Sequence, residues 1–139
     1  MNRSYFRYFA ISTIMFLSLN NLQAQEIPVV EFKKGACKGN CPVYSVEINE
    51  KGLLTYHGIA HVEIKGKWTR QLRKREFRKL KRLLRRAKMM KLDDHYDKNI
   101  MDASRTTLSF RHKKVNKTVI ANLYLPKPLL KAEKYIIEL

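Results

Sequence analysis

Apolar and polar residues alternate over several short stretches of the chain, and this pattern predicts strands. Residues 27–33 and 43–48 both show the period of two that is typical of a strand with one buried face. Residues 53–57 continue the alternation after the segment 49–52, which favours a hairpin turn because its asparagine and glycine tolerate positive φ. The first part of the domain is therefore expected to form antiparallel strands joined by short turns.

Further turn signals predict the remaining strands. We expect a turn at Gly58 and a fourth strand over residues 60–65. Residues 105–110 and 118–122 are expected to form a second hairpin around residues 113–116. In this interpretation four strands precede the first helix of the domain and two follow it.

The hydrophobic period changes after Trp68 from that of a strand to that of a helix. Apolar residues then recur at spacings of three, four and seven, which predicts one amphipathic helix from about Arg73 to Met90. This apolar stripe needs a sheet to bury against. Its members are Leu72, Phe77, Leu80, Leu83, Leu84, Ala87 and Met90.

The order of the predicted elements indicates the fold class. A last helix is expected to begin at residues 126–128, because proline is favoured in the first turn of a helix. Strands grouped apart from helices favour an α+β fold, here an antiparallel sheet of about five to six strands covered by one long amphipathic helix and a short C-terminal helix. No internal repeat or linker divides residues 25–139, so we expect a single domain. The last helix carries Leu129, Leu130, Ile136 and Ile137.

Four aromatic residues lie on the predicted strand segments. Large aromatic side chains in strands are more often part of a core than a platform for a ligand, so we expect them inside the domain. They are Phe32, Tyr44, Tyr56 and Trp68.

Residues 1–24 have the layout of a secretory signal peptide. Arg3 and Arg7 precede an apolar run over residues 9–19, and a polar segment follows it. The run is about half as long as the roughly 20 residues that a membrane-spanning helix needs, so an uncleaved anchor is the weaker alternative. We expect cleavage near Ala24 and a periplasmic or secreted domain with no membrane span of its own.

Composition adds a strong positive charge to this picture. The 139 residues are 45% hydrophobic, which excludes a wholly disordered chain, and their net charge is +17. Loss of Arg3 and Arg7 with the signal peptide leaves 27 basic residues against 12 acidic ones, a net charge of +15. Residues 67–91 alone hold thirteen basic residues and one acid, Glu76. The predicted long helix therefore carries most of the excess charge.

A helix with this much positive charge suggests an anionic partner. Such a helix can lie on an anionic membrane, follow a nucleic-acid backbone or dock an acidic protein, or its charged face can simply be solvated while its apolar stripe fills the core. We expect the stripe to be buried. Anionic lipid, lipopolysaccharide or an acidic protein are better partners than nucleic acid, because the protein is exported and the helix lacks exposed aromatics for base stacking. The anion-binding candidates are Arg75, Arg78, Lys79, Arg82, Arg85 and Arg86.

Cys37 and Cys41 lie four residues apart in a loop between two predicted strands. In an exported protein this pair favours a short-range disulfide that stiffens the loop. The alternative is a thiol-redox or copper-binding pair, since Cys-x-x-x-Cys-Pro resembles the copper-binding loop of the Sco copper chaperones. That family places its loop between a strand and a helix and adds a distant histidine ligand. Here residues 43–48 continue as a strand, and no third ligand can be assigned.

The sequence around the cysteines resembles a family of exported bacterial proteins, domain of unknown function 6438. Residues 29–45 carry the resemblance through the signature Cys-x-Gly-x-Cys-Pro-x-Tyr, and later segments keep the family's order. The resemblance implies a small exported or surface-tethered domain, common in Bacteroidota, and supplies no catalytic residue, cofactor or partner. Relatives commonly have a mixed or acidic helix, so the basic helix departs from their pattern. The later matching positions are Gly52, residues 56–58 and 62–66, residues 92–96, and Asp102.

An acidic cluster follows the predicted long helix. Asp93, Asp94, His95, Asp97 and Asp102 are of the residue types that ligate divalent cations. Their spacing matches neither a calcium loop nor a zinc site, so we expect these acids to offset basic charge or to cap turns. No metal site is predicted.

These features together favour a non-enzymatic interaction module. The chain has no Gly-x-Ser-x-Gly elbow, no phosphate-binding glycine loop and no helical His-Glu-x-x-His, so no catalytic residue and no cofactor are predicted. We expect an exported domain, stiffened by a Cys37–Cys41 disulfide, whose cationic helix face binds anionic envelope surfaces. The alternative function is thiol-redox chemistry or copper binding by the cysteine loop.

Overall fold

The structure is a computed structural model that describes residues 27–96, 102–122 and 124–139. The predicted signal peptide lies outside the described residues. The strands are β1 (Val30–Lys34), β2 (Val43–Ile48), β3 (Leu53–Ala60), β4 (Gly66–Gln71), β5 (His95–Tyr96), β6 (Arg105–His112) and β7 (Val115–Asn122). The helices are α2 (Lys74–Arg86), α3 (Leu130–Ile137) and the short 3-10 helices η1 (Met89–Lys91) and η2 (Lys127–Leu129).

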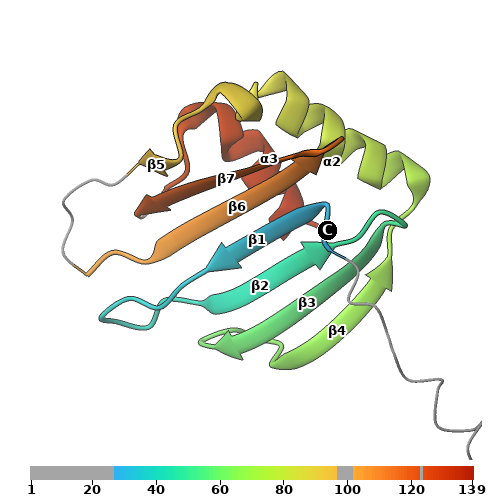
Figure 1. Cartoon of the computed structure of the whole chain (residues 1–139). Coiled ribbons are helices and arrows are strands. Elements are labelled where there is room, and N and C mark those ends of the chain that lie inside the picture. Colours follow the sequence, from blue (N-terminus) through green and yellow to red (C-terminus); the bar gives the residue numbers. More distant parts are fainter. Residues whose placement is uncertain (1–26, 97–101, 123) are drawn as a thin grey trace, which may run out of the picture.

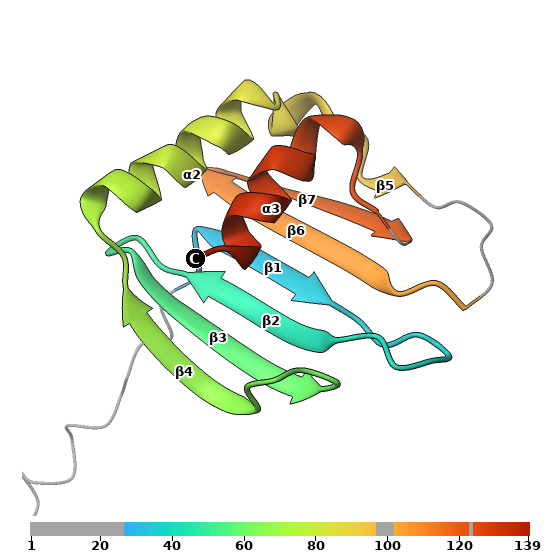
Figure 2. The same ribbon diagram turned by 180° about the vertical axis from the view of Figure 1, so that it is seen from behind.

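The described strands form one sheet in the order β4-β3-β2-β1-β6-β7-β5. Neighbouring strands are antiparallel except for β5 and β7, which are parallel. Both helices lie on the same side of this sheet (Figures 1 and 2). The expected α+β class and the two helices are confirmed, and the sheet has seven strands, more than expected.

The core lies between the helices and the side of the sheet that they cover. Buried strand residues on that side alternate with half-buried or exposed residues on the other side, which faces away from the helices. The predicted apolar stripe of the long helix is confirmed: Leu72, Phe77, Leu80 and Leu84 are buried, and its other three residues pack partly buried against the core. From the sheet, the largest fully buried side chains are Val30, Phe32, Ile48, Thr106, Leu108, Phe110 and Val119.

The prediction of a turn at Gly58 and a strand over residues 60–65 is wrong. β3 runs through Gly58 without a break, and residues 61–65 form the turn that leads into β4. Gly58 is required for close packing, because a Cβ atom there would overlap the backbone carbonyl oxygen of Ile64 and press on the Tyr56 ring. The glycine therefore lets the β3–β4 turn fold back over its own strand.

The helix α2 ends at Arg86, four residues before the predicted end. Ala87 caps it, and Lys88 has a left-handed backbone with φ of 51°, which redirects the chain into η1. If the helix continued, Met89 would lie four residues after Arg85 and therefore on the exposed cationic side of the helix. The change of direction lets Met89 become buried in the core instead.

The close contact at Gly58 gives a stability prediction. Gly58→Ala is expected to lower the free energy of unfolding by about 2 kcal/mol or more, because the atom it meets belongs to the backbone and cannot move aside cheaply. Gly39→Ala is the matched control, since its Cβ would meet nothing nearer than Cys37 Sγ at 4.0 Å. Urea unfolding followed by circular dichroism measures both, and equal midpoints would contradict the packing described here.

Candidate functional site

The outer face of α2 brings five of the six predicted anion-binding residues together. Phe77, Leu80 and Leu84 are buried against the sheet and so fix the rotation of the helix. Exposed arginines follow one another at spacings of three and four residues on the opposite side, which places them on one face. This face, the arginine stripe, consists of Arg75, Arg78, Arg82, Arg85 and Arg86.

Lys79, the sixth candidate, is also exposed but points elsewhere. Its Nζ atom lies 4.1 Å from the centre of the Tyr135 ring, on α3. A cation over an aromatic ring at this distance is attracted by the negative face of the ring. Lys79 therefore contributes to the contact between α2 and α3, which the sequence did not reveal.

The single acid of the basic segment is bonded at the start of α2. Glu76 accepts a hydrogen bond from the backbone N–H of Arg73 at 2.8 Å and one from the Arg70 guanidinium at 3.2 Å. The Arg73 N–H bond, with the charges of Arg70 and Arg73, lowers the pKa of Glu76. A carboxylate at this end also suits the helix dipole. Glu76 is thus bonded to Arg70 and Arg73, and it lies more than one helical turn away from Arg82, Arg85 and Arg86.

The acids after α2 pair with basic residues on other elements. Asp94 forms an ion pair with Lys117, which lowers the pKa of Asp94, and Asp102 lies 3.4 Å from Lys38. Asp97 lies outside the described residues. Among the residues that the structure describes, no three His, Cys, Asp or Glu side chains are placed to hold a metal ion.

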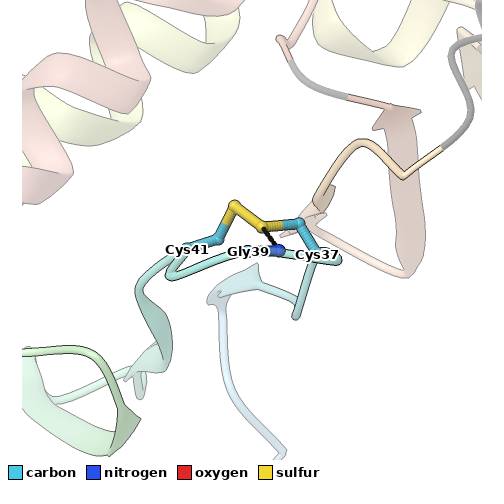
Figure 3. Close-up of a disulfide and its surroundings, with 3 residues drawn as sticks. All are labelled: Cys37, Gly39 and Cys41. Atoms are coloured by element: carbon cyan, nitrogen blue, oxygen red, sulfur yellow. Dashed lines mark hydrogen bonds between the residues drawn. A yellow bond between two sulfur atoms is a disulfide. The ribbon is translucent and has the colours of Figure 1, made fainter.

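The two cysteines of the chain are joined by a disulfide between β1 and β2 (Figure 3). The Cα atoms of Cys37 and Cys41 are 5.7 Å apart, and the backbone N–H of Gly39 donates to Cys37 Sγ at 3.3 Å. The bridge closes a ring within one loop and so links no two distant elements. This geometry supports the structural role expected for the pair.

A groove of about 730 Å³ lies on the helix side of β2, β3 and β4. Figure 2 shows that α2 and α3 leave this part of the sheet uncovered. Tyr44, Leu54 and Tyr56 form its floor, the turn at residues 61–65 forms one wall, and Ile136 with the chain end beyond it forms the other. The sequence did not predict this site.

Trp68 stands at the groove and is 60% exposed, so the expectation that it belongs to the core is wrong. Its indole N–H donates to the carbonyl oxygen of Lys65 at 3.4 Å. Phe32 is buried as expected, and Tyr44 and Tyr56 pack partly buried against the core. Trp68 differs because it belongs to β4, the edge strand that neither helix covers.

The floor of the groove is a poor environment for charge. Burial, then the nearby charge of Glu133 and the neighbouring Tyr56, raises the pKa of Tyr44 to about 12. Glu133 itself forms a largely buried ion pair with Lys34 at 3.0 Å. Burial also raises the pKa of Tyr56, whose hydroxyl donates to the Ile64 carbonyl oxygen at 3.2 Å. Both phenols are therefore neutral at ordinary pH. The arrangement can bind an apolar group but provides no activated nucleophile.

Comparison with known proteins identifies the family. Residues 28–139 match the family described as domain of unknown function (DUF6438), and the chain belongs to that family. The resemblance seen in the sequence is thereby confirmed. A search of curated proteins found no match. Within the described part of the chain, no helix is long and apolar enough to cross a membrane.

The disulfide loop yields a stability prediction. Replacing Cys37 and Cys41 together by serine is expected to lower the free energy of unfolding by about 2 kcal/mol, the chain-entropy estimate for so small a ring. The domain should keep its circular dichroism spectrum, because the bridge joins no separate elements. Loss of that spectrum would contradict a merely local role. Protein isolated from its native compartment should also show no free thiols on titration.

The neutral phenol of Tyr44 yields a prediction on pH. The pKa of Tyr44 is about 12 in the folded protein and 10.0 for an unperturbed tyrosine, so raising the pH between these values deprotonates the unfolded chain first. The stabilisation by this phenol is therefore present below pH 10 and lost as the pH approaches 12. Tyr44→Phe should make the alkaline fall in unfolding free energy shallower, whereas Tyr124→Phe, at an exposed tyrosine, should not. Identical pH profiles of the two variants would contradict the burial of Tyr44.

Proposed function

We propose that this protein is an exported, non-enzymatic binding module that uses the arginine stripe of α2 to bind anionic surfaces of the cell envelope. The observation that carries the proposal is the exposure of five arginines on one helix face, opposite the buried stripe. The role of α2 in the core holds that face outward. Export itself rests on the layout of residues 1–24.

The chemistry of arginine suits a phosphate-bearing partner. A guanidinium presents several N–H donors in a plane and binds phosphate oxygens in pairs, and it is weakly hydrated compared with an ammonium group. Arg75 and Arg86 are eleven residues apart, which corresponds to roughly 16 Å along the helix axis. A stripe of this length can contact several headgroups of an anionic lipid or lipopolysaccharide at once.

The charge balance of the domain supports the same partner. Four described acids on other elements pair with bases outside α2: Glu133 with Lys34, Asp102 with Lys38, Glu50 with Arg111 and Asp94 with Lys117. Glu76 is bonded to Arg70 and Arg73 at the start of the helix. Positive potential therefore concentrates along the rest of the arginine stripe, where an anionic surface would release its counterions on contact.

The runner-up function, thiol-redox chemistry or copper binding, needs free thiols at Cys37 and Cys41. The disulfide between them supports a structural loop instead. Nucleic acid remains a poorer partner than a lipid surface, because no aromatic side chain stands among the exposed arginines to stack on bases.

Sedimentation with lipid vesicles tests the arginine stripe. The protein should bind vesicles that contain phosphatidylglycerol more tightly than pure phosphatidylcholine vesicles, and the difference should shrink as salt rises. The double substitution Arg78→Glu and Arg82→Glu is expected to weaken binding at least about tenfold, since each basic residue near the surface contributes about 1 kcal/mol.

The matched control changes the net charge equally on the other side of the sheet. Lys67 and Arg105 are exposed strand residues on the face away from the helices, so Lys67→Glu with Arg105→Glu should affect binding much less. Equal loss in the two double variants would show that only net charge matters. Equal, salt-insensitive binding to neutral and anionic vesicles would remove the electrostatic basis of the proposal.

A further inference from the structure

We propose that the groove over β2, β3 and β4 binds the aliphatic chain of a single anionic amphiphile, with the charged headgroup at Arg70. This goes beyond the surface contact made by α2 and does not depend on it. Binding of one chain inside a groove and adhesion of a helix to a charged surface are separate events with separate residues.

The lining of the groove matches a hydrocarbon chain. The floor is made by Tyr44, Val46 and Leu54, and one wall is made by Ile136 and Ile137 from α3. A volume of about 730 Å³ lies within the range that small-molecule sites occupy. Polar groups are few on the floor, and the Tyr56 hydroxyl already donates to a backbone carbonyl. A chain of methylene groups forms no hydrogen bonds, so it loses none when it is buried on this floor.

A peptide fits the same surface less well. Its backbone brings one N–H and one C=O group per residue, and each costs free energy when it is buried without a partner. The floor side chains Val46 and Leu54 offer no such partners. An aliphatic chain is therefore the occupant that the chemistry of the floor favours.

The mouth of the groove has the apolar and cationic groups that an amphiphile needs. Trp68, Ile64 and Ile137 line it and remain 60%, 51% and 57% exposed, which is unusual for three large apolar side chains in one place. Covering them removes apolar surface from water. These side chains remain in contact with water in the free protein, and a bound aliphatic chain would bury them.

Charge at the same mouth favours a negative headgroup. Arg70 lines the groove with its side chain 46% exposed, and its bond to Glu76 uses one of the five N–H donors of a guanidinium. Among the charged residues that line the groove are Arg70 and one acid, Glu63, in the turn opposite, and Lys65 is exposed in that same turn. An anionic headgroup at Arg70 would leave its chain lying across Tyr56 and Leu54.

Trp68 is the single tryptophan of the chain, so its fluorescence reports on the groove alone. The full protein is titrated with 9,10-dibromostearate, whose bromine atoms quench an indole only at close contact. Saturable quenching with one chain per protein is expected. The uncharged methyl ester of the same chain should bind at least severalfold more weakly, because it lacks the negative group that Arg70 would hold.

Two exposed residues provide variants that should not disturb folding. Ile64→Glu and Ile137→Glu place a carboxylate at the mouth of the groove and should each weaken binding about tenfold or more, the scale of one lost aliphatic contact. Ile59→Glu is the matched control. Ile59 is 54% exposed and belongs to β3, but it does not line the groove.

The outcomes separate this proposal from adhesion by α2. Loss of quenching in Ile64→Glu and Ile137→Glu but not in Ile59→Glu supports a chain-binding groove, whatever the vesicle experiment shows. Absence of saturable quenching, equal weakening by Ile59→Glu, or equal binding of acid and ester would overturn the proposal. A shift of Trp68 emission by an uncharged hydrophobic peptide, with no quenching by dibromostearate, would also overturn it and assign the groove to a peptide.

Discussion

The apolar side of the sheet needs to be covered, and in the described chain α2 and α3, with the short helices η1 and η2, cover only part of it. The burial of residues across the strands shows which part of the sheet the helices cover. Phe32 and Leu108 in the middle of the sheet are fully buried, Leu54 on β3 is slightly less so, and Trp68 on the edge strand β4 is largely exposed. The arginine stripe and the groove both follow from this partial cover, since one is the outer side of a covering helix and the other is the part of the sheet left open.

The two surfaces meet where α2 begins. β4 leads into the helix through Leu72 and Arg73, and Glu76 on the helix accepts hydrogen bonds from Arg73 and from Arg70 at the groove. The groove therefore lies at the N-terminal end of the arginine stripe. The two proposed binding surfaces are thus joined through the contact between Arg70 and Glu76. A positive face and an apolar mouth side by side are the combination that interfacial proteins use.

The sequence predicted those features that depend on local periodicity. The spacing of Phe77, Leu80 and Leu84 was sufficient to place the buried side of α2 and, by exclusion, the arginines on the other side. The alternation in β2 and the turn before β3 were equally clear, because hydrophobic pattern and turn residues agree there. The α+β class followed from the order of such elements.

Other features depend on contacts between distant residues and could not be predicted from local patterns. Glycine is typical of turns, so the sequence favoured a turn at Gly58. The glycine lies inside β3 because the backbone carbonyl of Ile64 packs against it and leaves no room for a Cβ atom. β5 is two residues long and exists through its pairing with β7. Trp68 has the character of a core residue, but its exposure depends on which strand forms the edge and where α3 ends. The groove was missed for the same reason.

The most direct test of the account is nuclear magnetic resonance of the protein on anionic vesicles that carry a spin-labelled lipid, whose unpaired electron broadens nearby signals. The account predicts broadening at the outer residues of α2, such as Arg78 and Arg82, and at the Trp68 indole, with signals of Thr107 and Ser109 on the opposite face retained. Broadening centred on Thr107 and Ser109, with α2 unaffected, would contradict it.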